Sequence, residues 1–439
     1  MDKREVPKLA CCLVGLCFVL VTIGSVQADT ASVNTNWGGH LRAIGTVSDI
    51  DDDSIYAYVD KGRYYDGQLE LRLKNSLYLG AQWTVETHYE LVAMGGDTRE
   101  NTGDLENALS VTLPPSFYPS QTIDDDHRLF RLTRQFSRED EYLAYHRLDR
   151  LNIHYTPPWG TLRLGRQALT WGDGLVFNPM DLFNPFAPNA VQRDYKVGDD
   201  MAHLAVPFGP AEMQLLYVPR RDPDSGDLAE DRASYAMKYH GPAGPLEIDL
   251  MAARHYDEGI AGIGASGYVK DAAWRVNATY AHLSDESSQT EFFQVVANID
   301  YAWLWGGKNV YGLIEFYYNG LGRTDDYEKT LSDTSLVQRL ERGELYTLGR
   351  HYLAGQLQVE LHPLVRFHTT AITNLHDPSG LIQPQILWDI TGDLQAILGA
   401  QYYWGGSHTE YGGFDITLSD TTIPVAPSSS VYIWLTRYF

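Results

Sequence analysis

The residues best placed to do chemistry lie in one segment, from 162 to 199, where charges of both signs flank a run rich in Gly, Asn, Pro and Phe. The candidates are Arg163, Arg166, Asp173, Phe177, Asp181, Phe183, Arg193 and Lys196. This mixture of charged and aromatic side chains suits non-covalent contact with a polar solute or an ion. The chain contains no Gly-x-Ser-x-Gly, P-loop, dinucleotide-binding or His-Glu-x-x-His motif. The sequence therefore predicts no catalytic residue, no metal and no cofactor.

Composition and the N-terminal segment narrow the class of protein. In 439 residues, 34 Lys and Arg stand against 57 Asp and Glu, and the formal charge of -23 argues against a nucleic-acid partner. Residues 1–28 have the three parts of a secretory signal: a basic start, an apolar stretch from Leu9 to Ile23, and small residues at Val26 and Ala28. All three cysteines lie inside this segment, so we expect the mature chain, residues 29–439, to be exported and free of thiols.

Apolar and polar residues alternate along many segments of the mature chain. The pattern is clear from Leu69 to Leu73, from Leu77 to Leu91 and from Leu394 to Tyr402. Strict alternation predicts strands with one apolar and one polar face. Several segments reach the 9–11 residues that a tilted strand needs to cross a bilayer. Aromatic residues gather at the segment ends, which is typical of the interfacial girdles of membrane barrels.

The connections between these segments alternate between short and long. Short turns are predicted at 74–76, 157–160, 208–210, 241–244, 270–271, 306–308, 362–363 and 392–393, and long polar segments at 95–142, 172–199, 219–231, 320–346 and 405–430. Short turns on one rim and long loops on the other are typical of an outer-membrane barrel. The sequence thus predicts an all-β fold, a transmembrane antiparallel up-and-down β-barrel of about 18 strands, in the outer membrane of a Gram-negative-type bacterium.

The chain ends on an alternating segment, 431–439, that closes with Phe439. This ending resembles the assembly signal of bacterial outer-membrane barrels, and it implies the barrel-assembly machinery as a partner. Arg437 departs from the pattern, because that position is usually aromatic or apolar. We expect either that Arg437 reaches the headgroup region or that the last strand pairing is shifted. Membrane lipid and lipopolysaccharide are the other expected partners.

One segment resembles a known family. Gly165-Arg166-Gln167, followed by Trp171-Gly172-Asp173-Gly174, is similar to the wall-to-loop junction of alginate-export-type barrels and related porin-like families. The resemblance covers about this one strand and its loop. It implies an outer-membrane channel for a small or polymeric polar solute, without specifying which solute.

The same segment is expected to leave the barrel wall. With Leu162 and Leu164 facing outward, Arg166 would also face lipid, at a cost of about 2–4 kcal/mol near the membrane midplane. We therefore expect a bulge or an inward turn near Gly165. The Asn-Pro pairs that follow favour turns, so residues 172–199 are predicted to fold into the lumen as a constricting loop. The alternative is an ordinary external loop.

The polar faces of the strands carry charges that would line the lumen. The candidate lining residues are Glu70, Arg72, Glu86, Glu90, Arg150, Arg275, Asp300, Glu315, Glu360 and Arg366. Together with further inward positions the tally is ten acids against six bases, which predicts a modest cation preference. This balance argues against a conduit for a polyanion. An alternative interpretation is that most of these charges form ion pairs that stiffen the wall. Acidic runs at 51–53 and 124–126 are interpreted as solvated outer loops.

Three functions remain open. The first is an outer-membrane channel that passes small polar solutes or ions, or exports a polar compound. The second is the barrel sheath of a porin–cytochrome electron conduit, which an inward loop would obstruct. The third is an outer-membrane hydrolase, for which the sequence displays no catalytic triad.

Overall fold

The computed structural model describes residues 33–109, 125–138, 142–190, 195–283, 289–418 and 421–439. The predicted signal segment 1–28 and the candidate residue Arg193 lie outside these ranges. Within them, no helix is both long enough and apolar enough to cross a membrane.

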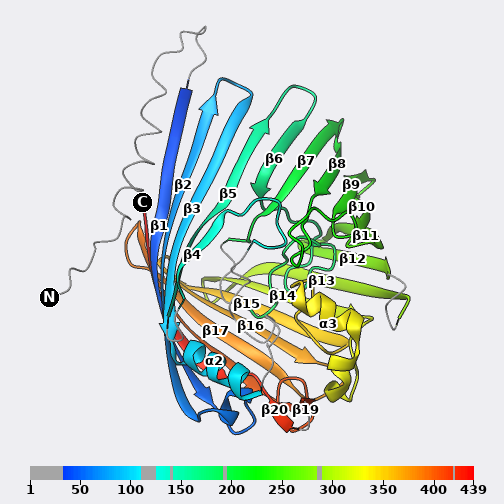
Figure 1. Ribbon diagram of the computed structural model, residues 1–439. Coiled ribbons are helices and arrows are strands. Elements are labelled where there is room, and N and C mark those ends of the chain that lie inside the picture. Colours follow the sequence, from blue (N-terminus) through cyan, green and yellow to red (C-terminus); the bar gives the residue numbers. More distant parts are fainter. Residues whose placement is uncertain (1–32, 110–124, 139–141, 191–194, 284–288, 419–420) are drawn as a thin grey trace, which may run out of the picture.

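Eighteen strands of the described chain form one closed antiparallel barrel (Figure 1). Each pairs with its neighbours along the chain, and β1 pairs with both β2 and β21, which closes the ring. The wall strands are β1 (Val33–Ile50), β2 (Gly62–Leu79), β3 (Trp83–Gly96), β5 (Tyr142–Tyr155), β6 (Thr161–Gln167), β7 (Asp199–Phe208), β8 (Ala211–Val218), β9 (Ser234–Ala243), β10 (Leu246–His255), β11 (Glu258–Val269), β12 (Ala272–His282), β13 (Glu291–Trp305), β14 (Lys308–Asn319), β15 (His351–His362), β16 (Val365–Asn374), β17 (Gly380–Asp389), β18 (Leu394–Trp404) and β21 (Ser429–Tyr438). The predicted fold class and strand number are confirmed.

Smaller elements occupy the long connections. They are η1 (Ile55–Tyr58), α2 (Asp97–Leu109), β4 (Thr133–Arg138), η3 (Tyr327–Ser332), α3 (Thr334–Glu341) and the hairpin of β19 (Phe414–Leu418) with β20 (Thr421–Val425). β4 pairs with the part of β5 that extends beyond β6. The helices and the β19–β20 hairpin gather at the long-loop end of the barrel (Figure 1).

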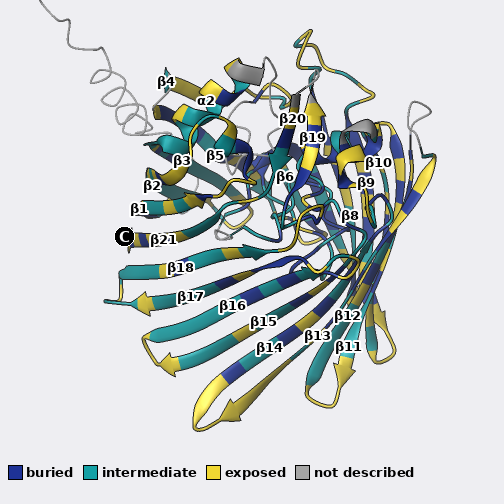
Figure 2. Cartoon of the chain, turned by 90° about the horizontal axis from the view of Figure 1, so that it is seen from below, coloured by how far each residue is buried: buried dark blue, intermediate teal, exposed yellow. Residues whose placement is uncertain are grey.

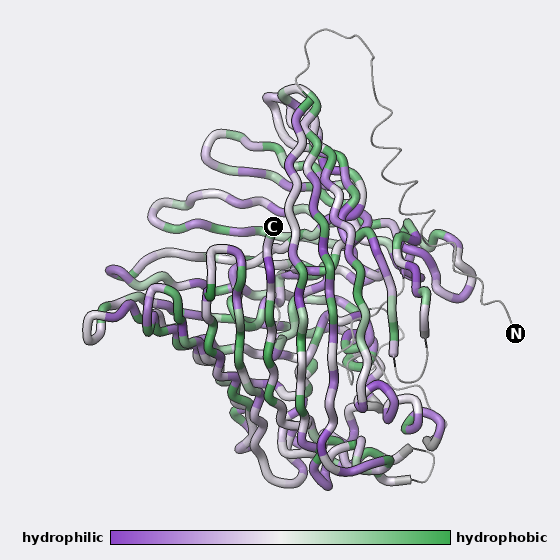
Figure 3. Tube along the Cα trace, turned by 90° about the vertical axis from the view of Figure 1, so that its left-hand side faces the viewer, coloured by the Kyte–Doolittle hydropathy of each residue, from purple (hydrophilic) through white to green (hydrophobic). Residues whose placement is uncertain are grey.

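The period-two alternation sorts side chains between the outside and the lumen. In β14, Ile314 is 59% exposed on the outer face, whereas the next residue, Glu315, is fully buried. The same change recurs along the neighbouring strands, both in burial (Figure 2) and in hydropathy (Figure 3). The outer face is an apolar surface whose backbone groups are satisfied by a closed ladder. This combination defines a barrel that spans a membrane.

The two rims differ as predicted, with one error in the turns. The connections at 156–160, 209–210, 244–245, 270–271, 306–307, 363–364 and 390–393 are short, and the long ones lie at the opposite rim. The predicted turn at 74–76 is wrong, because β2 runs through it to Leu79 and the chain turns at Gly80–Gln82. Gly80 takes φ +67°, which favours glycine. Leu79 pairs with Trp83 across three turn residues, so the parity of apolar positions continues and hides the turn in the sequence.

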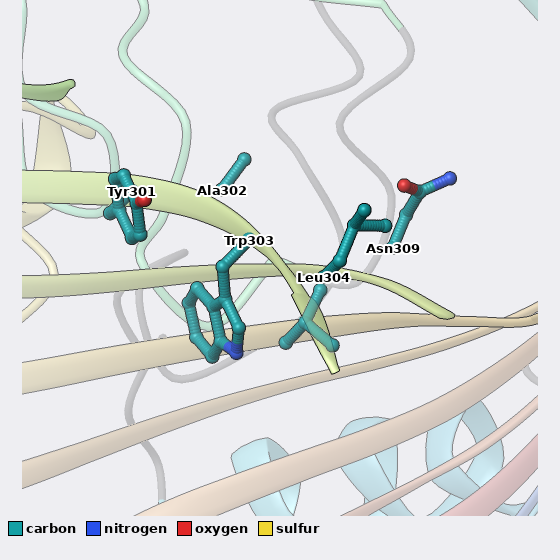
Figure 4. Close-up of a pocket in the computed structure, with 6 residues that line it drawn as sticks. Tyr301, Ala302, Trp303, Leu304 and Asn309 are labelled. Carbon is teal, nitrogen blue, oxygen red and sulfur yellow. The ribbon is translucent and has the colours of Figure 1, made fainter. Parts of the chain in front are cut away.

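Aromatic residues ring the short-turn rim. Tyr301 and Trp303 stack at 6.0 Å between ring centroids near the end of β13. With Leu304 and Asn309 they line a shallow hollow beside the turn at 306–307 (Figure 4). Rings at a strand end beside a short turn match an interfacial girdle, where polar atoms of the rings meet headgroups. The hollow lies at the rim itself, because Tyr301 and Trp303 have the outward parity whereas Leu304 and Asn309 have the lumen parity.

Arg166 is accommodated differently from the expectation. The ladders of β6 with β5 and with β7 show no register shift at Gly165, so the predicted bulge is absent, although this glycine takes φ +115°. Instead Arg166, 1% exposed, binds Asp200 and Asp125, each at 2.9 Å, and donates to the carbonyl oxygen of Phe130. The segment before β4 thus covers the charge. The nearby Arg166 guanidinium also helps to lower the pKa of Asp125, against the effect of burial.

Arg437 keeps the regular pairing of the last strand. It pairs with Leu41 on β1 and Leu394 on β18, without a register shift in either ladder. Its guanidinium lies 2.7 Å from the carboxylate of Asp393 in the short turn before β18. The alternative of a shifted last pairing is therefore wrong.

Candidate pore and inward loop

The described parts of the segment between β6 and β7, residues 168–190 and 195–198, lie inside the barrel (Figure 1). Near its start, Trp171 donates its Nε1 hydrogen to Gln214 of β8 at 2.6 Å. The backbone N–H of Asp173 then donates to the side chain of Asn277 on β12 at 2.8 Å. Both partners lie on the lumen side of the wall, and the loop has moved from β8, two strands from β6, to β12 on a more distant part of the ring.

Glu315 of β14 holds the next part of this loop. Its buried carboxylate accepts hydrogen bonds from three successive backbone N–H groups, those of Leu175, Val176 and Phe177, at 2.7–3.0 Å. Asn298 donates a fourth bond at 3.0 Å. A carboxylate that accepts several backbone bonds is a strong anchor, because charge-assisted hydrogen bonds are about twice as strong as neutral ones. The Phe177 ring also stacks on Tyr317, 4.4 Å away.

The second half of the loop reaches the opposite wall. The carbonyl oxygen of Asn189 accepts from Gln383 of β17 at 2.7 Å and from Gln401 of β18 at 3.0 Å. The ring of Tyr195 stacks against His40 of β1, and the Arg72 guanidinium of β2 lies 4.2 Å from its centroid. The loop therefore touches strands around most of the ring. The prediction of an inward-folded loop is confirmed, and the external alternative is wrong.

Residues of the loop also contact one another. Asp181 and Lys196 form an ion pair at 2.5 Å, and Lys196 also donates to the carbonyl oxygen of Leu169. Burial raises the pKa of Asp181 to about 6 and lowers that of Lys196, although each charge opposes the shift of the other. Phe183 packs edge-on against Trp171 in the main apolar cluster. These contacts make the segment a packed unit.

One wall of the lumen is a buried network of charges. Arg72 lies 2.7 Å from Asp149 and 3.5 Å from Glu90, which also binds Arg147, and Arg150 lies 2.7 Å from Asp149. Asp149 stands at a register shift between β3 and β5, so Asp149 and Arg150 can serve the same network. These residues and Glu70, which contacts His40 at 2.9 Å, are buried. For this wall the ion-pair interpretation holds.

Water reaches the other lining candidates more easily, except for the buried Glu315. Arg275 pairs with Asp300 at 2.6 Å, Arg366 pairs with Asp389 at 3.2 Å, and Glu360 accepts from Asn309 at 2.7 Å. Glu86 lies 3.2 Å from His88 and 3.7 Å from His154. All the candidate lining residues lie on wall strands, and Asp173, Phe177, Asp181, Phe183 and Lys196 lie in the inward loop. In the described ranges, no group of three or more His, Cys, Asp or Glu residues is arranged to hold a metal.

The long-loop rim contains a Ser–His–Glu contact. His255 lies 2.8 Å from Ser234 through Nδ1 and 3.1 Å from Glu344 through Nε2. Ser234 is fully buried, and its Oγ accepts a hydrogen bond from Arg220 at 2.5 Å. An acyl-transfer nucleophile needs access to substrate and a base for its proton. This serine is enclosed instead. The cluster therefore serves to connect β9, β10 and the segment after α3.

We expect the Glu344 carboxylate to stay ionised, and its contact with His255 to persist, at acid pH. Burial would raise its pKa, but the hydrogen bond with His255 and the charges of Arg342 and Arg339 lower it to about 2. A carboxyl with a lowered folded-state pKa stabilises the fold above its unfolded pKa of about 4.3, and this is lost only as pH falls through the folded value. Hydrogen exchange should show the backbone N–H of Glu344 protected from pH 7 to pH 4. Protection that disappears at pH 5 would contradict this assignment, and Glu344→Gln should lose protection throughout the range.

Several residues that hold the inward loop were not predicted from the sequence. Asn189, Tyr195, Gln383 and Gln401 make the contacts of the loop with the opposite wall. The alternation places both glutamines on the lumen face, but neutral amides carry no signal that separates them from other polar positions. Asn189 is 194 and 212 positions from its two glutamine partners, and partners so far apart in the chain leave no local sequence pattern.

The closed barrel, its apolar exterior and the loop folded into its lumen define an outer-membrane β-barrel of the porin type. The chain superposes on OccAB2 of Acinetobacter baumannii with a TM-score of 0.50 and 10% identity, over 92% of this chain and 98% of that one. OccAB1 of the same organism gives 0.50 and 9%, over 94% and 99%. A BenF-like porin from Pseudomonas fluorescens Pf-5 gives 0.48 and 7%, over 92% and 98%. No family model and no curated protein sequence matches the chain. At such identities the likeness shows the fold, and the resemblance to alginate-export-type barrels stays a prediction.

Proposed function

We propose that the protein is a passive diffusion channel for small polar solutes or ions, narrowed by residues 168–198. The observation that carries this proposal is the attachment of one loop to the lumen face of strands on both sides of the ring, through Glu315, Gln383 and Gln401. A loop attached at several points reduces the open cross-section without closing the barrel wall. Polar side chains on the wall beside it would replace part of a solute's hydration.

Liposome swelling tests this function directly. Vesicles that contain the folded protein are expected to admit small neutral sugars faster than protein-free vesicles, with a rate that falls steeply as the sugar grows. A narrowed channel gives this size dependence because the solute must fit beside the loop. Swelling equal to that of protein-free vesicles, with folding confirmed by heat-modifiable migration, would overturn the proposal.

We also predict a modest cation preference. Of the inward charges that water reaches, six are acidic: Glu86, Glu212, Glu247, Asp300, Glu360 and Asp389. Four are basic: Lys74, Arg163, Arg275 and Arg366. A low-dielectric wall focuses the field of this excess and raises the local cation concentration. Reversal potentials across a KCl gradient should report K⁺ over Cl⁻, and anion selectivity at neutral pH would contradict the tally.

The two other functions are less well supported. A cytochrome sheath needs an open lumen, which the inward loop occupies. A hydrolase needs an accessible nucleophile, and the Ser–His–Glu contact at the rim encloses its serine. We therefore favour a channel without enzymatic activity.

A further inference from the structure

Arg163 differs from the other arginines of the lumen. Arg72, Arg150, Arg275 and Arg366 each have a carboxylate oxygen within 3.5 Å. Arg163 makes no ion pair with any described residue, and its buried Nε has no hydrogen-bond partner there. A guanidinium that keeps its donors free beside water has the geometry to take a carboxylate or another oxyanion.

Two histidines flank Arg163 on the neighbouring strands. The ladders pair it with His154 of β5 and with His203 of β7, so the three residues form a row across the wall. His203 is 1% exposed, and its Nδ1 has no hydrogen-bond partner among the described residues. His154 is 25% exposed. Histidine is the side chain that gains charge between pH 8 and pH 5.

The charged groups around this row form no ion pair with Arg163, although one of them contacts His154. On β3, Glu86 contacts His88 and His154. On β5, Arg150 pairs with Asp149. On β8, Glu212 accepts from Gln214 at 2.5 Å. Neither glutamate comes within 4.0 Å of the Arg163 guanidinium, so no carboxylate of the described residues occupies its donors.

The row lies next to the start of the inward loop. Gln214 accepts from Trp171 of the loop at 2.6 Å and lies 3.3 Å from Nε2 of His203. Arg163, near the beginning of β6, therefore stands on the short-turn side of the constriction. A solute that approaches the loop from that side meets this row first.

We propose that Arg163, His154 and His203 form an anion-binding subsite for the oxyanion group of a small solute. The inference deepens the proposed channel function, because the subsite lies at the entrance of the narrowed passage. A local cationic row would offset the general field of a lumen that has an excess of acids. Protonation of His154, which water reaches, strengthens the subsite as pH falls, whereas buried His203 contributes the unpartnered Nδ1.

Titration calorimetry on the folded protein in detergent tests the subsite without requiring conduction. Sulfate and acetate are the probes, one for a tetrahedral oxyanion and one for a carboxylate, and the charge of sulfate stays constant from pH 7.5 to 5.5. Arg163→Gln is expected to weaken binding about tenfold or more, because it removes a charged, forked donor. The matched control Arg275→Gln removes an equal charge that is already paired with Asp300 and should change affinity less than about twofold.

Sulfate binding measured at two pH values tests the contribution of His154. Wild-type protein should bind sulfate more tightly at pH 5.5 than at 7.5, and His154→Gln should reduce that difference. Absence of saturable binding of both probes, or equal losses in Arg163→Gln and Arg275→Gln, would overturn the subsite. Binding that follows the expected pattern in a protein that fails the liposome test would reject the channel and leave the subsite standing.

Discussion

Deletion of residues 177–186 is expected to raise single-channel conductance by about twofold or more, because these residues fill space in the lumen that water and ions would otherwise occupy. The segment contains Phe177, whose ring stacks on Tyr317, and Phe183, whose ring packs edge-on against Trp171. None of the deleted residues takes part in a wall ladder, so the barrel should still assemble. Planar-bilayer recordings give the conductance, and heat-modifiable migration in gels confirms the fold.

A deletion of equal length from an outer connection is the matched control. Residues 222–231 lie between β8 and β9 at the long-loop rim and form no wall ladder. Their removal should change conductance little. Equal effects of the two deletions would mean that the inward loop does not set the narrowest point.

Glu315→Leu is expected to release the loop from the wall and leave the wall itself intact. Three backbone N–H groups lose their acceptor at once, and a buried donor without a partner costs about 1–3 kcal/mol. The loop should therefore detach locally instead of staying docked with three unsatisfied groups. We expect hydrogen exchange at Leu175, Val176 and Phe177 to accelerate by about 100-fold or more, which corresponds to at least about 2.7 kcal/mol.

Single-channel records should show the same release as increased noise and a higher mean conductance. Glu360→Leu is the control, because Glu360 is another inward acid on the next strand, β15, and its one side-chain partner in the described part of the chain is Asn309. Glu315→Gln keeps one acceptor oxygen and should fall between wild type and Glu315→Leu. If Glu315→Leu and Glu360→Leu behave alike, lumen charge and not loop anchoring accounts for the change.

The architecture could be predicted from the sequence because every strand of a barrel carries the same local alternation of apolar and polar residues. Alternation at Leu69–Leu73 or Leu394–Tyr402 depends on neighbours two residues apart, and each strand repeats it. The same property explains the misplaced turn at 74–76. Polar residues there keep the parity of the strand, so Lys74 and Ser76 extend the lumen face of β2, whereas the true turn at Gly80 preserves parity and leaves no break.

The inward loop was predicted from composition, but its partners were not. Apolar residues among Asn-Pro turns cannot form a ladder strand and need a buried place, which predicts the lumen. The residues that receive them, such as Glu315 and Gln383, lie more than 100 positions away and look like any other polar lining residue. For Arg166 the problem was predicted but its solution was not. The parity of Arg166 correctly indicated an unfavourable position for a charge. The charge is neutralised by Asp125 and Asp200, and not moved inward by a bulge.

The conductance of the unmodified protein in a planar bilayer tests the central claim most directly. We predict discrete steps in 1 M KCl with a weak cation preference, and a step size below that of the variant lacking residues 177–186. A correctly folded, heat-modifiable protein that inserts without producing any steps, and whose deletion variant is equally silent, would contradict the assignment as a channel narrowed by its own loop.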